Sequence, residues 1–407
     1  MPTFLRCLPL GLLLLLSWAA HPLVAQRRDF TGQYQPLRRI QVDTRREGDS
    51  LRVYLYFPDG SVLQRGEPLR VAVWENYQAK RPLWRTTVGQ LARRIHKAES
   101  AAWVEFCVAA AAVQPGQVLS ASCAPENEAD TGDAAWLSIS RERLARPFLL
   151  TDSLGDPLLR RYVRRGERFL IDCYGPDKPT TAKHYDASFV AALPPMSTAG
   201  APPQQRKLPA RDSLFFRAGQ LLTLSQPGLY ALRVSGTAAP VGLLVTDEDF
   251  PELNTADELI QPLIYLTTSA ERNALREAAQ PKRAVDQFWL KVAGGNQTQA
   301  RQLIRTYYGR VAAANQLFTA HKAGWMTDRG MLYTVLGAPE TVYRTATEEN
   351  WVYRGTREGS TTYTFRHKPS TFAPEHYELV RRPEYEMLWY AAVEQWRKGM
   401  TTARSGR

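Results

Sequence analysis

The residue types that carry chemistry are sparse in this chain, and their spacing matches no common catalytic pattern. Its 407 residues contain no H-E-x-x-H, C-x-x-C, G-x-S-x-G, Walker or G-x-G-x-x-G motif. No two histidines are spaced i, i+4, the arrangement that lets one helix face hold a metal ion. The sequence therefore predicts no metal and no cofactor, and enzyme activity is the less favoured interpretation.

Two short polar runs could still act as acids or bases. His184-Tyr185-Asp186 could form a proton relay, and Glu348-Glu349 could act as paired carboxylates. Acid–base pairs usually come from separate elements of a fold, whereas the members of each run are adjacent in sequence. We therefore expect His184 at the surface of a strand or at its edge, and the two glutamates in a solvated turn.

Two further groups of side chains could bind ligands. Five arginines flank a predicted hairpin turn and would form a basic tip, either simply solvated or in contact with anionic lipid headgroups or glycans: Arg160, Arg161, Arg164, Arg165 and Arg168. Four tryptophans could line part of a sugar-binding face, although burial in a core is the commoner fate of this residue: Trp74, Trp84, Trp103 and Trp136.

The N-terminus predicts an exported protein. Arg6 precedes an apolar run, Leu8 to Ala20, that is too short to span a membrane, and Ala25 is the small residue that signal peptidase requires. We expect residues 1–25 to be a signal peptide and the mature chain to lie in the periplasm, with association to the outer membrane as an added expectation. No later stretch is apolar enough to cross a bilayer, so no transmembrane span is expected in the mature chain.

Two of the three cysteines beyond this leader could be bonded. Residues 101–112 and 117–123 have strand patterns on either side of a Gln-Pro-Gly turn signal. In a hairpin centred on Pro115, residues whose numbers sum to 230 would face each other, and Cys107 and Cys123 satisfy that sum. A cross-strand disulfide is therefore one prediction for an oxidising compartment, and two buried free thiols are the other.

Composition and pattern together predict three domains. The net charge of +12 is spread along the chain, so nucleic acid is not an expected partner. Residues 26–147 contain a strict period-2 alternation from Leu51 to Phe57, and residues 148–248 repeat the pattern of short strands separated by turn signals. This favours two tandem, Ig-like β-sandwich domains.

Residues 249–407 change to a helical pattern and predict an α+β domain. Thr268 and Glu271 have capping-box spacing at the start of one helix. Pro281 and Asn296 begin two more, the second long enough to reach Phe318. Short strands and a final helix should follow, at residues 331–336, 351–354, 361–367 and 383–398.

Between the long helix and the first of these strands lies Gly324-Trp325-Met326-Thr327-Asp328, followed by Arg329-Gly330. This run resembles the signature of the GWxTD-domain proteins, exported proteins typical of the Bacteroidetes. Further similarity lies in Phe288-Trp289-Leu290, Tyr307 to Val311, Ala314-Asn315, Gly337 to Glu340 and Trp351 to Tyr353. The resemblance implies architecture and export, and it implies no activity.

The residues of this run have structural roles open to them. Gly324 would allow a backbone geometry closed to other residues, and Trp325 would bury its ring. Thr327 and Asp328 would accept hydrogen bonds from free backbone N–H groups at a strand entrance, and Arg329 would pair with a carboxylate. The alternative is a functional loop in which Asp328 and Arg329 contact a ligand or a partner protein.

A shorter resemblance bears on function. Leu336 to Pro339, Trp351 to Tyr353 and the strand from Thr361 to His367 resemble the small lipoprotein of the β-barrel outer-membrane assembly machine. The tandem sandwiches and the absence of a catalytic constellation favour a non-catalytic scaffold that binds envelope or outer-membrane proteins and supports outer-membrane protein assembly. The alternatives are a hydrolase of envelope glycan or peptide that uses carboxylates near Asp328, and a carbohydrate-binding protein.

Overall fold

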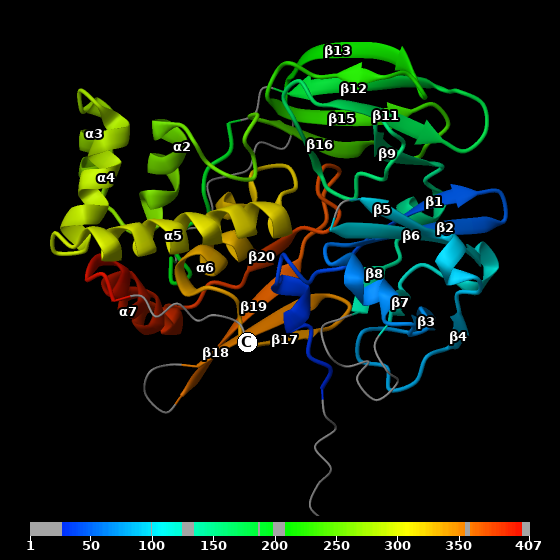
Figure 1. The fold of residues 1–407 in the computed structure, drawn as a ribbon, viewed down its shortest axis with the longest axis horizontal. Coiled ribbons are helices and arrows are strands. Elements are labelled where there is room, and N and C mark those ends of the chain that lie inside the picture. The colour runs from blue at the N-terminus through cyan, green and yellow to red at the C-terminus, as the bar shows by residue number, and fades with distance from the viewer. Residues whose placement is uncertain are drawn as a thin grey trace, which may run out of the picture.

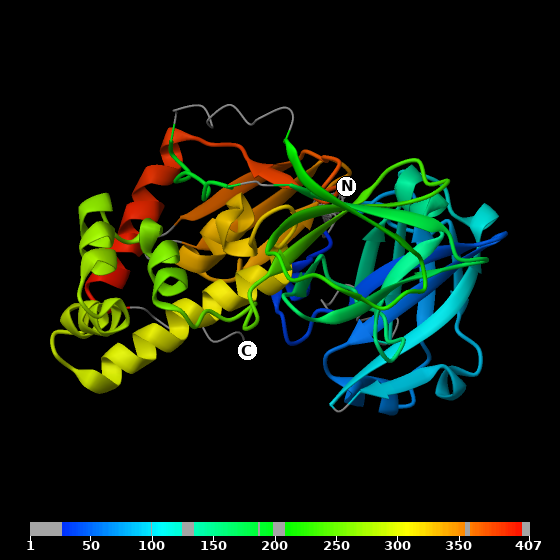
Figure 2. The same cartoon turned by 90° about the horizontal axis from the view of Figure 1, so that it is seen from above.

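The computed structural model describes residues 27–98, 100–123, 134–185, 188–197, 208–354 and 359–400. These residues form five mainly antiparallel sheets, and most of the helices follow the fourth of them in the chain. The helices and the last sheet lie together on one side of the molecule, and the sheets nearest the N-terminus lie on the other (Figures 1 and 2). The predicted signal peptide lies outside the described residues. Within the described ranges, no helix has the length and apolar character needed to span a membrane.

Two four-stranded antiparallel sheets come first. Sheet A has the order β1 (Gln41–Glu47), β2 (Ser50–Phe57), β6 (Ala101–Ala109) and β5 (Ile95–Ala98). Sheet B has the order β4 (Trp84–Thr87), β3 (Arg70–Trp74), β7 (Val118–Ser122) and β8 (Ala134–Ser138). Val53 and Leu55 of β2 are fully buried in one core with Leu119 of β7, which confirms the alternation predicted for this strand.

Two further sheets share a second core. Sheet C has the order β14 (Leu222–Thr223), β11 (Arg168–Cys173) and β9 (Phe148–Asp152). Sheet D has the order β10 (Tyr162–Arg164), β16 (Val241–Thr246), β15 (Gly228–Val234), β12 (Pro179–Tyr185) and β13 (Ala210–Arg217), with β10 parallel to β16. Phe169 and Ile171 of sheet C are fully buried together with Leu232 of sheet D. The short helix α1 (Arg141–Ala145) precedes this pair of sheets.

The C-terminal part combines a sheet with helices. Sheet E has the order β17 (Thr341–Arg344), β18 (Glu348–Arg354), β19 (Ser360–His367) and β20 (Tyr377–Leu379). The helices are α2 (Ala256–Ile260), α3 (Ser269–Glu277), α4 (Pro281–Val292), α5 (Gln297–Phe318), α6 (Asp328–Leu336) and α7 (Glu386–Arg397). Trp289 of α4 and Trp351 of β18 are fully buried in the same core. The capping box at Thr268 and the predicted starts of α4 and α5 are confirmed.

One predicted strand is a helix. The segment from Met331 to Leu336 belongs to α6, and Thr327 is the N-cap of this helix. Residues 330–335 are all buried, so the segment lacks the polar face that would reveal a helical period. A short apolar run of this kind cannot be assigned to helix or strand from periodicity alone.

The two predicted hairpins do not form, because the chain changes sheet at each turn. β6 pairs with β2 and β5 in sheet A, whereas β7 pairs with β3 and β8 in sheet B. Cys107 is exposed, Cys123 is buried, and both are free thiols, so the proposed disulfide loses its geometric basis. Likewise β10 lies in sheet D and β11 in sheet C. A turn signal marks a reversal of the chain, but it does not say which strands become neighbours.

Residues 27–40 pack on sheet E, although they precede sheet A in the chain. The Phe30 N–H donates to the Val342 carbonyl oxygen at 2.9 Å. Tyr34 is buried with its ring centroid 4.9 Å from that of Trp351. In Figure 1 this segment is the dark blue helical turn beside β17. The predicted first domain included these residues, yet their side chains complete the C-terminal core.

We expect three free thiols in the mature protein. Alkylation of the denatured, non-reduced chain should label Cys107, Cys123 and Cys173, which mass spectrometry counts directly. In the native protein Cys107 should react first, because burial raises the pKa of both Cys123 and Cys173 to about 11. A mass that increases only after reduction would show that a disulfide is present and would contradict the expectation.

Candidate functional site: a basic cavity beside a buried motif

The run Gly324 to Asp328 lies in the core of the molecule. Gly324 to Met326 form a single turn of 3₁₀ helix, η7, packed against α5. A Cβ atom on Gly324 would lie 1.9 Å from the carbonyl oxygen of Ala314, and one on Gly330 would lie 1.8 Å from that of Gly324. Both positions therefore require glycine because the backbones approach closely, and not because of the unusual backbone angle that we expected at Gly324.

Trp325 and Thr327 fix the turn through hydrogen bonds. The buried Trp325 donates its backbone N–H to Asn315 Oδ1 at 3.2 Å, and its carbonyl oxygen accepts from the Tyr265 hydroxyl at 3.1 Å. Thr327 Oγ1 accepts from the Gly330 N–H at 3.0 Å, as an N-cap residue does. These hydrogen bonds of Trp325 and Thr327 all join residues of the C-terminal part of the chain.

Asp328 is also engaged within the molecule. Its side chain is nearly buried, and Oδ2 accepts from the Leu379 N–H of β20 at 2.8 Å. Oδ1 forms an ion pair with Arg381 at 2.5 Å, and Arg381 donates in turn to the Leu193 carbonyl oxygen at 3.2 Å. A carboxylate in the first turn of α6 is additionally favoured by the helix dipole. Asp328 therefore connects α6 to sheet E and to a segment that lies between β12 and β13 of sheet D.

That segment, residues 188–197, covers the motif. The Ala192 N–H donates to the Met326 carbonyl oxygen at 2.9 Å. Lys322 Nζ donates to the Val190 carbonyl oxygen at 3.0 Å. Because another part of the chain binds along the motif in this way, the motif is not an open loop.

Arg329 turns in a different direction and contacts a buried carboxylate. Glu349 is fully buried, with Arg329 Nη1 at 3.3 Å and Arg344 Nε at 2.9 Å. The Tyr34 hydroxyl also donates to this carboxylate. Burial raises the pKa of Glu349 to about 8, and the nearby Glu375 carboxylate adds to the shift. The ion pairs with Arg329 and Arg344 act in the opposite direction, because they favour the charged carboxylate. The cluster joins the N-terminal segment, the motif and sheet E.

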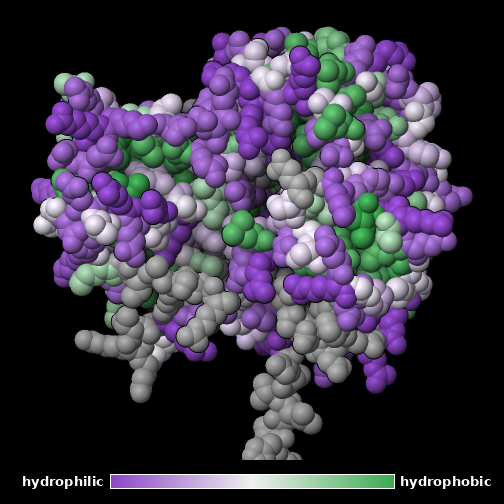
Figure 3. Space-filling view, viewed as in Figure 1, coloured by the Kyte–Doolittle hydropathy of each residue, from purple (hydrophilic) through white to green (hydrophobic). Residues whose placement is uncertain are grey.

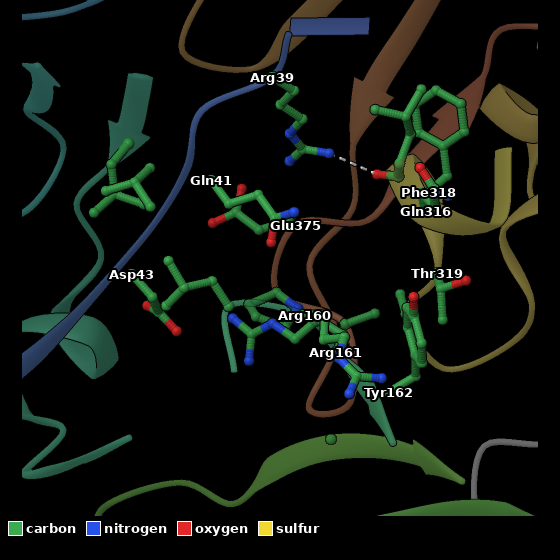
Figure 4. A pocket seen from close by; sticks show the side chains of 18 of the residues that line it. Arg39, Gln41, Asp43, Arg160, Arg161, Tyr162, Gln316, Phe318, Thr319 and Glu375 are labelled. Carbon is green, nitrogen blue, oxygen red and sulfur yellow. Dashed lines mark hydrogen bonds between the residues drawn. The ribbon is translucent and has the colours of Figure 1, made fainter. Parts of the chain in front are cut away.

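A cavity of about 380 Å³ opens beside this cluster. Residues of β1, β8, α1 and β9 line part of it. Further walls come from the N-terminal segment, from the chain that precedes β10, and from the C-terminal domain. Arg39, Arg161 and Glu375, one from each of these parts, point towards the same space (Figure 4). The end of α5 closes another side with Phe318 and Thr319.

The arginines predicted to form one basic tip are divided between the cavity and the surface. Arg160, Arg161 and Arg164 line the cavity, whereas Arg165 and Arg168 are exposed. Since β10 and β11 belong to different sheets, no hairpin gathers these five side chains at its end.

The two polar runs are placed differently from our expectation. His184 is buried in sheet D, with its ring stacked on Tyr230 at 4.5 Å, and Asp186 lies outside the described residues. Glu348 and Glu349 lie on strand β18, so the predicted solvated turn is wrong. They point to opposite faces of the strand and do not act as a pair. Within the described ranges no three acidic, histidine or cysteine side chains converge as metal ligands would.

The four tryptophans do not form one face. Trp103 is buried on sheet A, while Trp84 lies on the edge strand β4 of sheet B. Trp74 and Trp136 pack together with ring centroids 5.7 Å apart, and the Arg28 guanidinium lies over both rings. This arrangement offers no flat row of exposed rings for a sugar chain.

Comparison with known proteins identifies the C-terminal part. Residues 228–398 match the model of the GWxTD domain. The chain is therefore a GWxTD domain-containing protein, as the run from Gly324 to Asp328 indicated. The match begins at the first residue of β15, upstream of the domain boundary predicted at residue 249, and so includes the last two strands of sheet D. No curated protein matches the chain.

Sequence reasoning missed the cavity and the buried carboxylate beside it. For Glu349 a signal existed, because Glu349, Trp351 and Tyr353 share the period-2 spacing of one strand face. Extending the predicted strand upstream by two residues would have placed Glu349 on the buried face. Arg39 carries no comparable signal, since a single arginine in an irregular segment does not reveal its neighbours.

Replacing Asp328 should destabilise the fold. We expect Asp328→Ala to lower the free energy of unfolding by about 3 kcal/mol, because it leaves Arg381 and the Leu379 N–H without their buried partner. Chemical denaturation followed by circular dichroism measures this loss. Asp328→Asn, which can still accept the backbone hydrogen bond, should lose less.

The exposed Asp286 on α4 gives a matched control, and Asp286→Ala should stay close to the wild-type protein. A wild-type unfolding midpoint for Asp328→Ala would contradict the structural role of this carboxylate.

Two half-buried histidines beside the motif should make stability depend on pH. Burial lowers the pKa of His321 to about 3 and that of His376 to about 4, and the two rings lie 5.1 Å apart. In the unfolded chain both groups titrate near pH 6.5, so the unfolded state takes up protons first as the pH falls. The free energy of unfolding should therefore fall between pH 7 and pH 5, by roughly 2 kcal/mol for each histidine.

Urea denaturation at several pH values tests this. His376→Gln should flatten the pH dependence, while replacement of the exposed His96 by Gln should leave it unchanged. An identical slope for His376→Gln and the wild-type protein would rule out a contribution from His376.

Proposed function

We propose that this GWxTD domain-containing protein is a non-catalytic scaffold of the cell envelope, which binds envelope or outer-membrane proteins and supports their assembly. In this proposal each of the first two pairs of sheets is an Ig-like β-sandwich, and the α+β domain fixes them relative to one another. The shared cores of sheets A and B, and of sheets C and D, support the sandwich assignment. Export by the N-terminal signal would bring the chain to the periplasm.

The observation that carries the proposal is the edge strand β13. It pairs only with β12 among the described strands, so one side of its backbone is available to another chain. Phe215 is 80% exposed and Leu214 is 41% exposed at its centre. Figure 3 shows hydrophobic surface over this part of sheet D. Natural edge strands usually avoid this combination of an unpaired edge and apolar side chains, because it favours strand pairing between chains.

We therefore propose that the partner adds an extended segment beside β13. Backbone hydrogen bonds would supply affinity in such a contact, and alternate side chains would supply specificity. Arg211, Asp212 and Arg217 lie on the same strand around the apolar centre, where they could restrict the contact to a segment of complementary charge.

The placement of the motif favours this proposal over a hydrolase. An acid–base mechanism needs carboxylates that face a substrate, whereas Asp328 is nearly buried and paired with Arg381. Glu349 is buried and contacts two arginines. Neither carboxylate is free to exchange protons with a substrate unless existing ion pairs break.

Site-specific photocrosslinking in cells tests the β13 contact. A crosslinking residue at position 215 of the tagged full chain should capture one envelope protein in near-stoichiometric amount. The same residue at Leu154, which is 86% exposed outside sheet D, is the matched control and should not capture that protein.

Phe215→Asp should reduce copurification of the captured protein at least tenfold, while Leu154→Asp should not. In the purified complex, hydrogen exchange of the β13 amides should slow. Equal capture from both positions, or no effect of Phe215→Asp, would refute a partner at this edge.

A further inference from the structure

The cavity between the N-terminal segment, β10 and the C-terminal domain carries an excess of positive charge. Eight arginines line it, against three carboxylates. The arginines are Arg39, Arg143, Arg146, Arg160, Arg161, Arg164, Arg329 and Arg344, and the carboxylates are Asp43, Glu349 and Glu375. Such an excess inside a protein is costly unless hydrogen bonds or anions compensate each charge.

Most of these arginines already have partners. Arg143 and Arg146 share Asp43, and Arg143 also reaches Glu375 at 3.1 Å. Arg329 and Arg344 share Glu349, as described above. These four arginines are therefore paired with the three carboxylates of the lining.

Two more of the arginines that line the cavity bind partners that lie just outside it. Arg160 pairs with Glu167, and Arg164 Nε donates to the Phe250 carbonyl oxygen at 2.6 Å. The Nη1 atom of Arg160 is nevertheless buried without a hydrogen-bond partner within the described part of the chain.

Arg39 and Arg161 lack a carboxylate partner in the described ranges. Arg39 Nη1 donates to the Leu317 carbonyl oxygen at 3.1 Å, and the Arg161 guanidinium makes no hydrogen bond to any described residue. Burial is the main cause that lowers the pKa of each to about 10. Neighbouring arginines add to the shift, whereas Asp43 opposes it at Arg161 and Glu375 opposes it at both. Both side chains keep accessible surface because they face the cavity.

We propose that this cavity is a binding site for a small multivalent anion, a compound that carries at least two carboxylate or phosphoryl groups. Arg39 and Arg161 would each hold one group. The planar fork of a guanidinium matches the oxygens of a carboxylate or a phosphoryl group. A volume of about 380 Å³ suits a small ligand and is too small for a folded macromolecule.

Arg39 and Arg161 come from separate parts of the cavity wall, and this has a consequence for binding. Arg39 belongs to the N-terminal segment and Arg161 to the chain before β10, so one anion would neutralise charges from two separate parts of the molecule. The anion would stabilise the junction because it binds the assembled cavity and not the separated parts.

Calorimetric titration of the full mature chain with pyrophosphate and with citrate tests the site. Sodium chloride keeps the ionic strength constant, so that general screening is not measured as binding. We expect saturable one-site binding of at least one anion. Binding of pyrophosphate alone indicates a phosphoryl ligand, binding of citrate alone indicates a carboxylate ligand, and binding of both supports the chemistry that they share.

Arg161→Gln should weaken that binding at least tenfold. Arg161→Lys, which keeps the charge but loses the fork, should fall between this variant and the wild-type protein. Replacement of the exposed Arg168 by Gln is the matched control and should change the affinity less than twofold. Circular dichroism shows whether each variant is folded, and Arg39→Gln replaces any Arg161 variant that is not.

Absence of saturable binding of either anion to the wild-type protein would overturn the proposal. Equal affinities for the wild-type protein and a folded Arg161→Gln or Arg39→Gln variant would also overturn it. The outcome is independent of the scaffold proposal, because neither pyrophosphate nor citrate binding requires a partner at β13.

Discussion

Glu349 has no contact with solvent, and a carboxylate in that position has to be compensated by hydrogen bonds and positive charge from its surroundings. The compensation comes from Tyr34 of the N-terminal segment, Arg344 of β17 and Arg329 of α6. This requirement joins parts of the chain that are far apart in sequence. It also gives the GWxTD motif a physical role, because the glycines, the threonine cap and Asp328 fix the first turn of α6 and thereby direct Arg329 at the buried charge.

The need to compensate buried carboxylates also explains why arginines gather around the cavity. Eight arginines and three carboxylates line the cavity beside this buried carboxylate. The GWxTD motif and the arginine-lined cavity are neighbours but are not the same site. The side chains of the motif make their hydrogen bonds and ion pairs within the domain. The side chains of the proposed anion site lie in other segments, which carry no recognisable sequence pattern.

Local signals in the sequence predict most of the individual helices and strands. They predict few of the pairings between strands. The alternation in β2, the capping box at Thr268 and the helix starts at Pro281 and Asn296 depend on residues within a few positions, and each was predicted. Which strands become neighbours in a sheet depends on distant residues, so the predicted hairpin between β6 and β7 is wrong. The cavity depends on three distant parts of the chain, and no local pattern encodes it.

The docking of residues 27–40 on sheet E has a consequence for how the chain is made. Tyr34 is synthesised early, yet its hydroxyl contacts a carboxylate 315 residues further along. In a chain that folds as it is synthesised, residues 27–40 therefore cannot reach their place until sheet E exists, and sheets A to D form while this segment is still unattached. Until then Phe30 and Tyr34 remain exposed apolar groups, and their insertion closes the finished molecule.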